Sequence, residues 1–173
     1  MKNLIYLFIL SVTLFSCEEK RQLKLIPLTT TSDDAEQLMR QFMNNSEERR
    51  MYLNEKLMDS ILKIDPDFGM ALALNNFGDR DNRRANLINA YNLRENLSYI
   101  EANVIESIYE QTINGDLSKA DNILSLLIEK HPDYYQLYIL SGTIKNKLQD
   151  PKGSQVMWEK ALDIYPESFD ALE

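Results

Sequence analysis

The sequence of 173 residues has one cysteine, one histidine, five glycines and five prolines. A single cysteine cannot form a disulfide within the chain, so the fold must be stabilised by packing alone. One cysteine and one histidine also cannot supply the sets of thiolates and imidazoles that form zinc sites. The few glycines form no phosphate-binding loop, and the scarcity of glycine and proline favours a helical protein.

Positive charge is scarce relative to negative charge. Nineteen Lys and Arg residues against 27 Asp and Glu residues give a net charge of −8 at pH 7. Because an acidic surface repels the phosphate backbone, we expect no nucleic-acid partner. The only histidine, His131, precedes Pro132 at the end of a predicted helix, where it can interact with the last carbonyl groups. No nucleophile stands near a base in a recognisable arrangement, so we expect neither an enzyme nor a cofactor.

Long hydrophobic runs are absent except at the start of the chain. A basic residue, Lys2, precedes an almost wholly apolar run over residues 4–15. As a helix this run would span about 18 Å at 1.5 Å per residue, too short for a hydrocarbon core about 30 Å thick. We therefore expect a secretory signal peptide over residues 1–16 rather than a membrane-spanning helix.

The residues around the single cysteine make this expectation more specific. Leu14-Phe15-Ser16-Cys17 resembles the lipobox of bacterial lipoproteins, although Phe15 replaces the usual small residue. The resemblance implies cleavage before Cys17 and acylation there, with diacylglycerol on the sulfur and a palmitate-type chain on the amine, which anchors the protein to a membrane. The alternative is an ordinary signal peptide followed by an incidental cysteine.

The residues that follow the cysteine bear on the location. The acidic pair Glu18 and Glu19 resembles the export signals of surface lipoproteins in Bacteroidota. This implies a bacterial cell envelope, with the outer membrane favoured over the inner membrane and the periplasmic or surface face left open. We expect residues 17–31 to form the lipidated cysteine and a tether. A cluster of capping residues at 29–34 then predicts a first helix that begins near Ser32 or Asp33.

Three prolines end apolar helical segments at a regular interval. Pro132 and Pro166 are 34 residues apart, and Pro66 precedes Pro132 by 66 residues, close to twice that spacing. This period is typical of solenoids built from helix–turn–helix repeats. Within a helical domain at residues 32–173 we expect repeats at 35–68, 69–100, 101–134 and 135–168.

Capping residues and apolar periodicity place the helices inside these repeats. In the third repeat we expect helices at 102–113 and 118–130, separated by a turn at Gly115, and in the fourth at 136–148 and 154–164. Ser98 and Glu101 form a capping box that predicts a helix start just after Ser98.

The repeats resemble the tetratricopeptide repeat family. Gly142 and Ser154 occupy positions at which that family has small residues, and Trp158 occupies a bulky position. Asn45 and Asn54 depart from the family pattern, which has an aromatic and a small residue there. The resemblance implies an all-α fold, a right-handed solenoid of about four antiparallel helix pairs.

The resemblance also implies a concave groove formed by the first helix of each pair. Its ligand-facing positions hold mostly apolar, aromatic and neutral polar residues, which suit a peptide or an amphipathic segment. The alternative is that Phe77, Ile105 and Ile139 belong to the core. The expected groove residues are Met70, Phe77, Arg80, Ile105, Tyr109, Thr112, Gln136, Ile139, Thr143 and Asn146.

Two functions are compatible with this pattern. The first is a lipid-anchored scaffold or adaptor of the envelope that binds a peptide or a protein through the groove. The second is an accessory component of a glycan or nutrient uptake complex, in which tyrosines stack on sugars. The candidate tyrosines are Tyr109, Tyr134, Tyr135 and Tyr138.

The C-terminal residues raise a separate question. Phe169, Ala171 and Leu172 have the pattern of a further first helix without a partner helix. They could dock on the helix of Trp158 as a short cap, or form an apolar edge through which the protein associates with itself.

Overall fold

The structure is a computed structural model and describes residues 23–47, 50–168 and 171. These residues form eight α-helices, and no β-strand occurs among them. The expected all-α class is therefore confirmed. The signal peptide, Cys17 and most of the C-terminal segment 169–173 lie outside the described residues. The helices are α1 (Asp33–Glu47), α2 (Asn54–Ile64), α3 (Gly69–Leu74), α4 (Arg80–Leu93), α5 (Tyr99–Tyr109), α6 (Leu117–Lys130), α7 (Tyr135–Lys147) and α8 (Pro151–Ile164).

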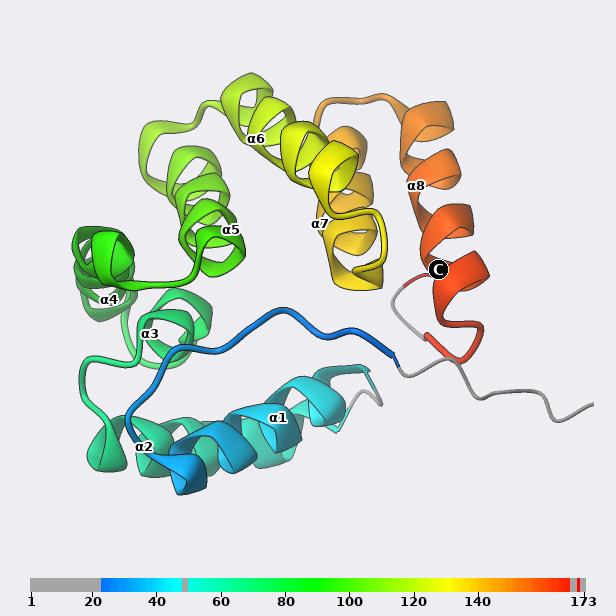
Figure 1. Cartoon of the computed structure of the whole chain (residues 1–173). Coiled ribbons are helices and arrows are strands. Elements are labelled where there is room, and N and C mark those ends of the chain that lie inside the picture. Colours follow the sequence, from blue (N-terminus) through cyan, green and yellow to red (C-terminus); the bar gives the residue numbers. More distant parts are fainter. Residues whose placement is uncertain (1–22, 48–49, 169–170, 172–173) are drawn as a thin grey trace, which may run out of the picture.

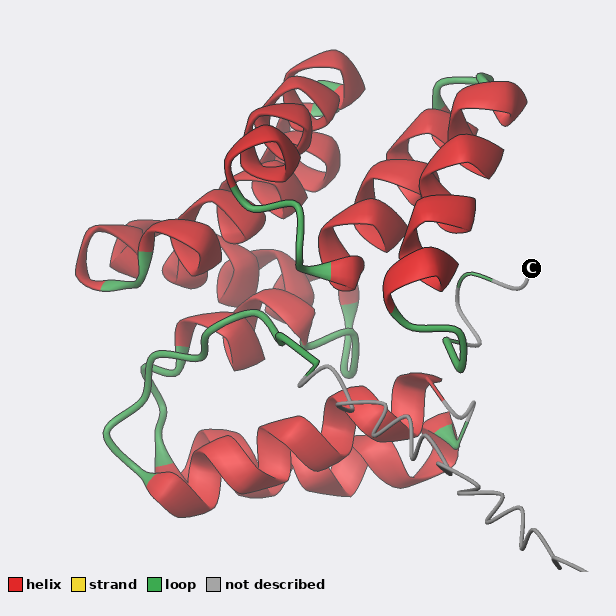
Figure 2. Cartoon of the chain, turned by 45° about the vertical axis from the view of Figure 1, so that its right-hand side comes forward, coloured by secondary structure: helices red, strands yellow, loops and turns green. Residues whose placement is uncertain are grey.

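The helices pack in sequential pairs, α1 with α2, α3 with α4, α5 with α6 and α7 with α8. Figure 1 shows the pairs following one another around an arch, with the N-terminal segment crossing its inner side. Figure 2 shows the same open arrangement from another direction. α6 also packs against α7, which joins the third pair to the fourth.

Side-chain caps set the starts of the later helices. The Ser98 hydroxyl accepts a hydrogen bond from the Glu101 N–H, which confirms the helix start predicted just after Ser98. The second half of the predicted capping box does not form, because the Ser98 N–H donates to the Thr29 hydroxyl and Glu101 Oε2 accepts from the Thr29 N–H. Asp116 caps α6, and Asp150 caps α8 by accepting from the Gly153 N–H. α8 begins at Pro151, three residues before the predicted start, because proline suits the first position of a helix.

The connection between α5 and α6 continues α5 by a π-helical turn, Glu110–Asn114. Gly115 then ends the helix with φ of 70°, in the left-handed region predicted for this position. The Asp116 N–H donates to the Glu110 carbonyl oxygen at 2.9 Å and closes the turn. The turn therefore fixes the angle at which α6 returns along α5.

The core runs along the inside of the pairs in two clusters. The larger cluster includes fully buried side chains from the seven helices α1 to α7, and Ile128 contacts both clusters. The smaller one lies between α7 and α8 and includes Tyr138, Ala161 and Ala171. Ala171, from the C-terminal segment, is therefore buried against the last pair. The fully buried side chains of the larger cluster include Met39, Met58, Ile61, Met70, Ile105, Leu124, Leu127, Leu137 and Ile144.

The last pair is held at close range by Gly142. A Cβ atom at this position would lie 2.3 Å from Trp158 Nε1, so the indole of α8 occupies the space a side chain would need. The Ser154 hydroxyl donates to the Gly142 carbonyl oxygen at 2.9 Å. The small residues at positions 142 and 154 therefore allow the two helices to approach closely.

The first pair has a buried amide network in place of small and aromatic residues. Asn45 Nδ2 donates to Asn54 Oδ1 at 3.1 Å, and both side chains are buried. Asn54 Nδ2 lies 2.9 Å from the Ser46 hydroxyl and 3.2 Å from the Phe42 carbonyl oxygen. The two departures from the family pattern therefore satisfy one another, as buried polar groups must.

Candidate functional site

A cavity of about 800 Å³ lies on the inner side of the arch, between α1, α3, α5 and α7. Val104 and Ile108 face it from successive turns of α5, and Ile139 and Leu140 face it from α7. Most of its lining is apolar. Its further lining residues include Leu23, Leu25, Ile26, Arg40, Phe42, Met43, Met70, Leu74, Phe77, Tyr135, Gln136 and Tyr165.

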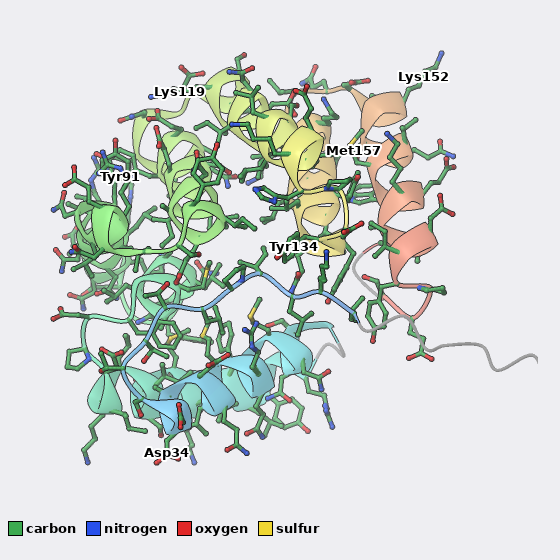
Figure 3. All side chains as sticks on the ribbon, in the orientation of Figure 1. Asp34, Tyr91, Lys119, Tyr134, Lys152 and Met157 are labelled. Atoms are coloured by element: carbon green, nitrogen blue, oxygen red, sulfur yellow. The ribbon has the colours of Figure 1, made fainter. Side chains whose placement is uncertain are left out.

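An extended segment, residues 23–31, forms one side of this cavity. It crosses the inner face of the arch (Figure 1), and side chains from helices on both sides fill the space around it (Figure 3). Ile26 is only 2% exposed. We expected a tether at these positions, but the segment instead packs on the helices and reduces the open part of the inner face.

The polar groups of the cavity bind the backbone of this segment. Gln136 Oε1 accepts from the Ile26 N–H at 3.1 Å, and Arg40 Nη1 donates to the Ile26 carbonyl oxygen at 2.9 Å. Arg40 is itself held by Glu36, one turn earlier on α1, through an ion pair of 3.0 Å. Both backbone groups of Ile26 are therefore hydrogen-bonded, the N–H to a side chain of α7 and the carbonyl oxygen to a side chain of α1.

The C-terminal half of the segment binds the start of α5. The Thr29 N–H donates to Glu101 Oε2 at 2.8 Å, and the Ser98 N–H donates to the Thr29 hydroxyl at 3.2 Å. The Thr30 hydroxyl donates to Asp65, just after α2. The segment is therefore hydrogen-bonded to side chains of α1, α5 and α7, and its position depends on contacts distant in sequence.

Glu101 is the most unusual titratable group beside the segment. Its side chain is fully buried, and its Oε1 has no hydrogen-bond partner among the described residues. Burial raises the pKa of the Glu101 carboxyl, and hydrogen bonding from Thr29 and from the Met70 backbone, together with the charge of Arg40, opposes this rise only in part. The segment therefore supplies part of what stabilises this buried acid.

Four of the predicted groove residues line the cavity: Met70, Phe77, Gln136 and Ile139. Ile105 is fully buried in the larger core cluster, in line with the core alternative stated for it. Phe77 and Ile139 are in part groove residues and in part core residues. Each lines the cavity, and each is also half-buried and contacts a core cluster.

The other predicted groove residues lie elsewhere. Tyr109 stacks on Tyr91 of α4 with ring centroids 4.0 Å apart, and the Arg94 guanidinium lies 3.7 Å from the Tyr91 ring centroid. Figure 3 shows Tyr91 above α4, toward α5 and away from the N-terminal segment. Thr112, Thr143 and Asn146 are exposed and do not line the cavity.

The second pair differs most from the expected repeat. α3 ends at Leu74, so Phe77 lies in the following loop rather than on a helix, and Arg80 is the exposed first residue of α4. Two local signals end α3 early: Asn75 Oδ1 accepts from the Phe77 N–H, and Gly78 has φ of 81°. Arg80 is not among the residues that line the cavity.

Sequence reasoning missed the contribution of the first helix and of the segment before it. Phe42 and Met43 of α1 line the cavity, as do Leu23 and Ile26. The helical spacing of Met39, Phe42 and Met43 was the available signal on α1. The segment offered only a weak alternation of apolar residues, which does not reveal the helices it contacts.

Further titratable side chains lie outside the segment of residues 23–31. The described residues contain no group of three or more His, Cys, Asp or Glu side chains placed to hold a metal ion. His131 lies between the rings of Tyr99 and Tyr134, with centroids 6.1 and 6.2 Å away. Glu110 and Lys119 form a 2.7 Å ion pair, and Figure 3 places Lys119 at the outer end of α6, away from the segment. No helix among the described residues combines the length and apolar character needed to cross a bilayer.

Comparison with known proteins adds no relative. No protein-family model matches the chain, and searches of curated proteins and of solved structures give no significant match.

Proposed function

We propose that this chain is a binding module of the cell envelope that holds a peptide or a segment of another protein in the cavity on its inner face. We further propose that its four helix pairs form a right-handed solenoid of the tetratricopeptide type. The regular succession of pairs, the close contact at Gly142 and the predicted cap at Ser98 support this architecture.

The cavity is the observation that carries the proposal. Its volume of about 800 Å³ is within the range of ligand sites, and it is apolar with a few polar groups that can bind a backbone. Gln136 offers an acceptor and Arg40 offers donors, the two groups that an extended chain requires. A peptide that buries apolar side chains between α1, α5 and α7 would satisfy both.

The glycan alternative has less support. Sugars need exposed aromatic faces and many hydrogen-bonding groups, and the candidate tyrosines are occupied by protein contacts. Tyr109 stacks on Tyr91, Tyr135 packs 4.9 Å from Tyr165, and Tyr138 is buried. The structure therefore favours a peptide over a sugar as the ligand of this cavity.

We also propose a lipid anchor at Cys17 and the outer membrane as the location, on the basis of the lipobox and the acidic residues that follow it. An anchor of two or three acyl chains would hold the domain firmly at the bilayer surface. Metabolic labelling with an alkyne fatty acid would test this: the label should enter the wild-type chain and should be lost in Cys17→Ser.

Selection from a random peptide library on the full chain in detergent micelles would test the binding function. Selected peptides should bind the wild-type chain and lose binding in Ile139→Lys, which places a charge in the cavity wall. Val156→Lys is the matched control, because Val156 is 44% exposed on α8 and does not line the cavity. Peptides that bind Ile139→Lys as well as wild type would refute the proposed site, provided that both variants melt cooperatively.

A further inference from the structure

The segment of residues 23–31 binds the inner face of the arch as an extended peptide ligand would. Both backbone groups of Ile26 are hydrogen-bonded to helices, and its side chain is 2% exposed at the cavity. Pro27 follows, which has no N–H to satisfy and which disfavours helix at Ile26. The sequence thus keeps the segment extended where its most buried aliphatic side chain meets the cavity.

The contacts on either side of Ile26 give the site a direction and a charge preference. Lys24 Nζ lies 2.7 Å from Asp133, just before α7, and the Asp133 carboxylate raises the pKa of Lys24. Three residues after Ile26, the Thr29 N–H donates to Glu101. The inner face therefore accepts a cationic side chain two residues before the anchor and a backbone N–H three residues after it.

Several features make the docked segment replaceable by another chain. It forms no helix or strand of its own, so its position depends on a few contacts with the helices. Both members of the Lys24–Asp133 pair are more than half exposed, and such pairs add little stability. A competing peptide would have to replace the buried side chain of Ile26, the partly buried Leu23 and Leu28, and six hydrogen bonds.

We propose that residues 23–31 are a built-in occupant of the cavity, and that the partner is an extended peptide with the same pattern. That pattern is an aliphatic residue at the place of Ile26 with a basic residue two positions before it. This inference rests on the proposed peptide-binding function and adds its regulation. The chain's own segment occupies the site in most molecules. The apparent association constant for the partner is therefore the intrinsic constant multiplied by the fraction of molecules in which the segment is undocked.

Fluorescence anisotropy with a labelled peptide of residues 23–31 (Leu-Lys-Leu-Ile-Pro-Leu-Thr-Thr-Thr) tests this on the full chain in detergent micelles. Ile26→Asp should undock the chain's own segment, because burial of one isoleucine side chain corresponds to about a tenfold to hundredfold preference. The peptide should therefore bind Ile26→Asp at least tenfold more tightly than wild type. Val156→Asp, which adds the same charge at an exposed position of α8 outside the cavity, should bind like wild type.

The outcomes separate this inference from the proposed function. If the peptide binds wild type and Ile26→Asp equally, or binds neither, the built-in occupant is refuted. In that case library peptides that still require Ile139 would leave the proposed function intact. If no library peptide and no segment peptide binds any variant, both proposals fail.

A second measurement covers the case in which Ile26→Asp does not fold. Hydrogen exchange on the wild-type chain should show the Ile26 and Thr29 amides exchanging at least tenfold more slowly than an unstructured peptide. Excess segment peptide, carrying heavy isotopes for distinction by mass, should remove this protection. Unprotected amides in the free chain would refute the docked occupant, as would protection that the peptide cannot remove.

Discussion

Gly142→Ala is the substitution that most directly tests the packing of the last pair. The added Cβ atom would lie 2.3 Å from Trp158 Nε1, 2.6 Å from Cδ1 and 2.9 Å from Cε2. Each of these separations is shorter than any stable van der Waals contact. The indole cannot easily move aside, because Ser154, one turn earlier on α8, is hydrogen-bonded to the Gly142 carbonyl oxygen.

Two effects of opposite sign determine the change in stability. Alanine favours helix over glycine by about 1 kcal/mol, which alone would stabilise α7. Overpacking of a closed interface costs about 1–3 kcal/mol, and the three short distances place this site at the upper end. We therefore expect Gly142→Ala to lower the free energy of unfolding by about 2 kcal/mol.

Urea unfolding followed by circular dichroism measures this change. Thr143→Ala is the control, because it alters the adjacent exposed residue of α7 and should change the free energy of unfolding by no more than about 0.7 kcal/mol. In the double variant Gly142→Ala/Trp158→Leu the alanine should cost less than in the presence of Trp158, since the clash is gone. A stabilising effect of Gly142→Ala would refute the close approach of α7 and α8.

Three further changes test other parts of the fold. Asn54→Leu should lower the free energy of unfolding by about 1–3 kcal/mol in urea titrations, because buried Asn45 loses its amide partner; equal stability would contradict the network. Gly115→Ala should cost about 1 kcal/mol in the same assay through its φ of 70° alone, because nothing lies within 4 Å of the added Cβ. Hydrogen bonds from Lys119 and Asn114 hold the pKa of Glu110 below its usual value, so its stabilising contribution is present above the unfolded-state pKa and lost as pH falls through the folded one. In thermal melts, the melting temperature of Glu110→Gln should therefore fall less between pH 5 and pH 3 than that of wild type. An equal fall in both proteins would contradict this.

Features that local sequence determines could be predicted well. Gly115 marked a left-handed helix end, and Ser98 marked the start of α5, because each acts on backbone groups within a few residues. The approximate bounds of α6 and α7 also agree with the structure. Local signals misled at the start of α8, which begins at Pro151, three residues before the predicted start. They also did not indicate that α3 ends at Leu74, before the loop of Asn75 and Gly78.

The candidate site was harder to predict because it depends on contacts between distant parts of the chain. The hydrogen bond from Ile26 to Gln136 spans 110 residues, and nothing in the composition of residues 23–31 indicates it. Tyr109 had the spacing of a groove residue, but its ring stacks on Tyr91 of the preceding pair. Periodicity shows which face of a helix is apolar, whereas the neighbours of that face depend on how the pairs are arranged.

The most direct test of the account is site-specific photo-crosslinking in the native host. A photoreactive amino acid would replace Ile139 in the cavity wall or Val156 on the exposed face of α8. The account predicts that Ile139 crosslinks one dominant protein through an extended segment of that protein, identified by mass spectrometry, and that Val156 does not. Crosslinking of the same proteins from both positions, or of none from Ile139, would contradict a peptide-binding site on the inner face of the arch.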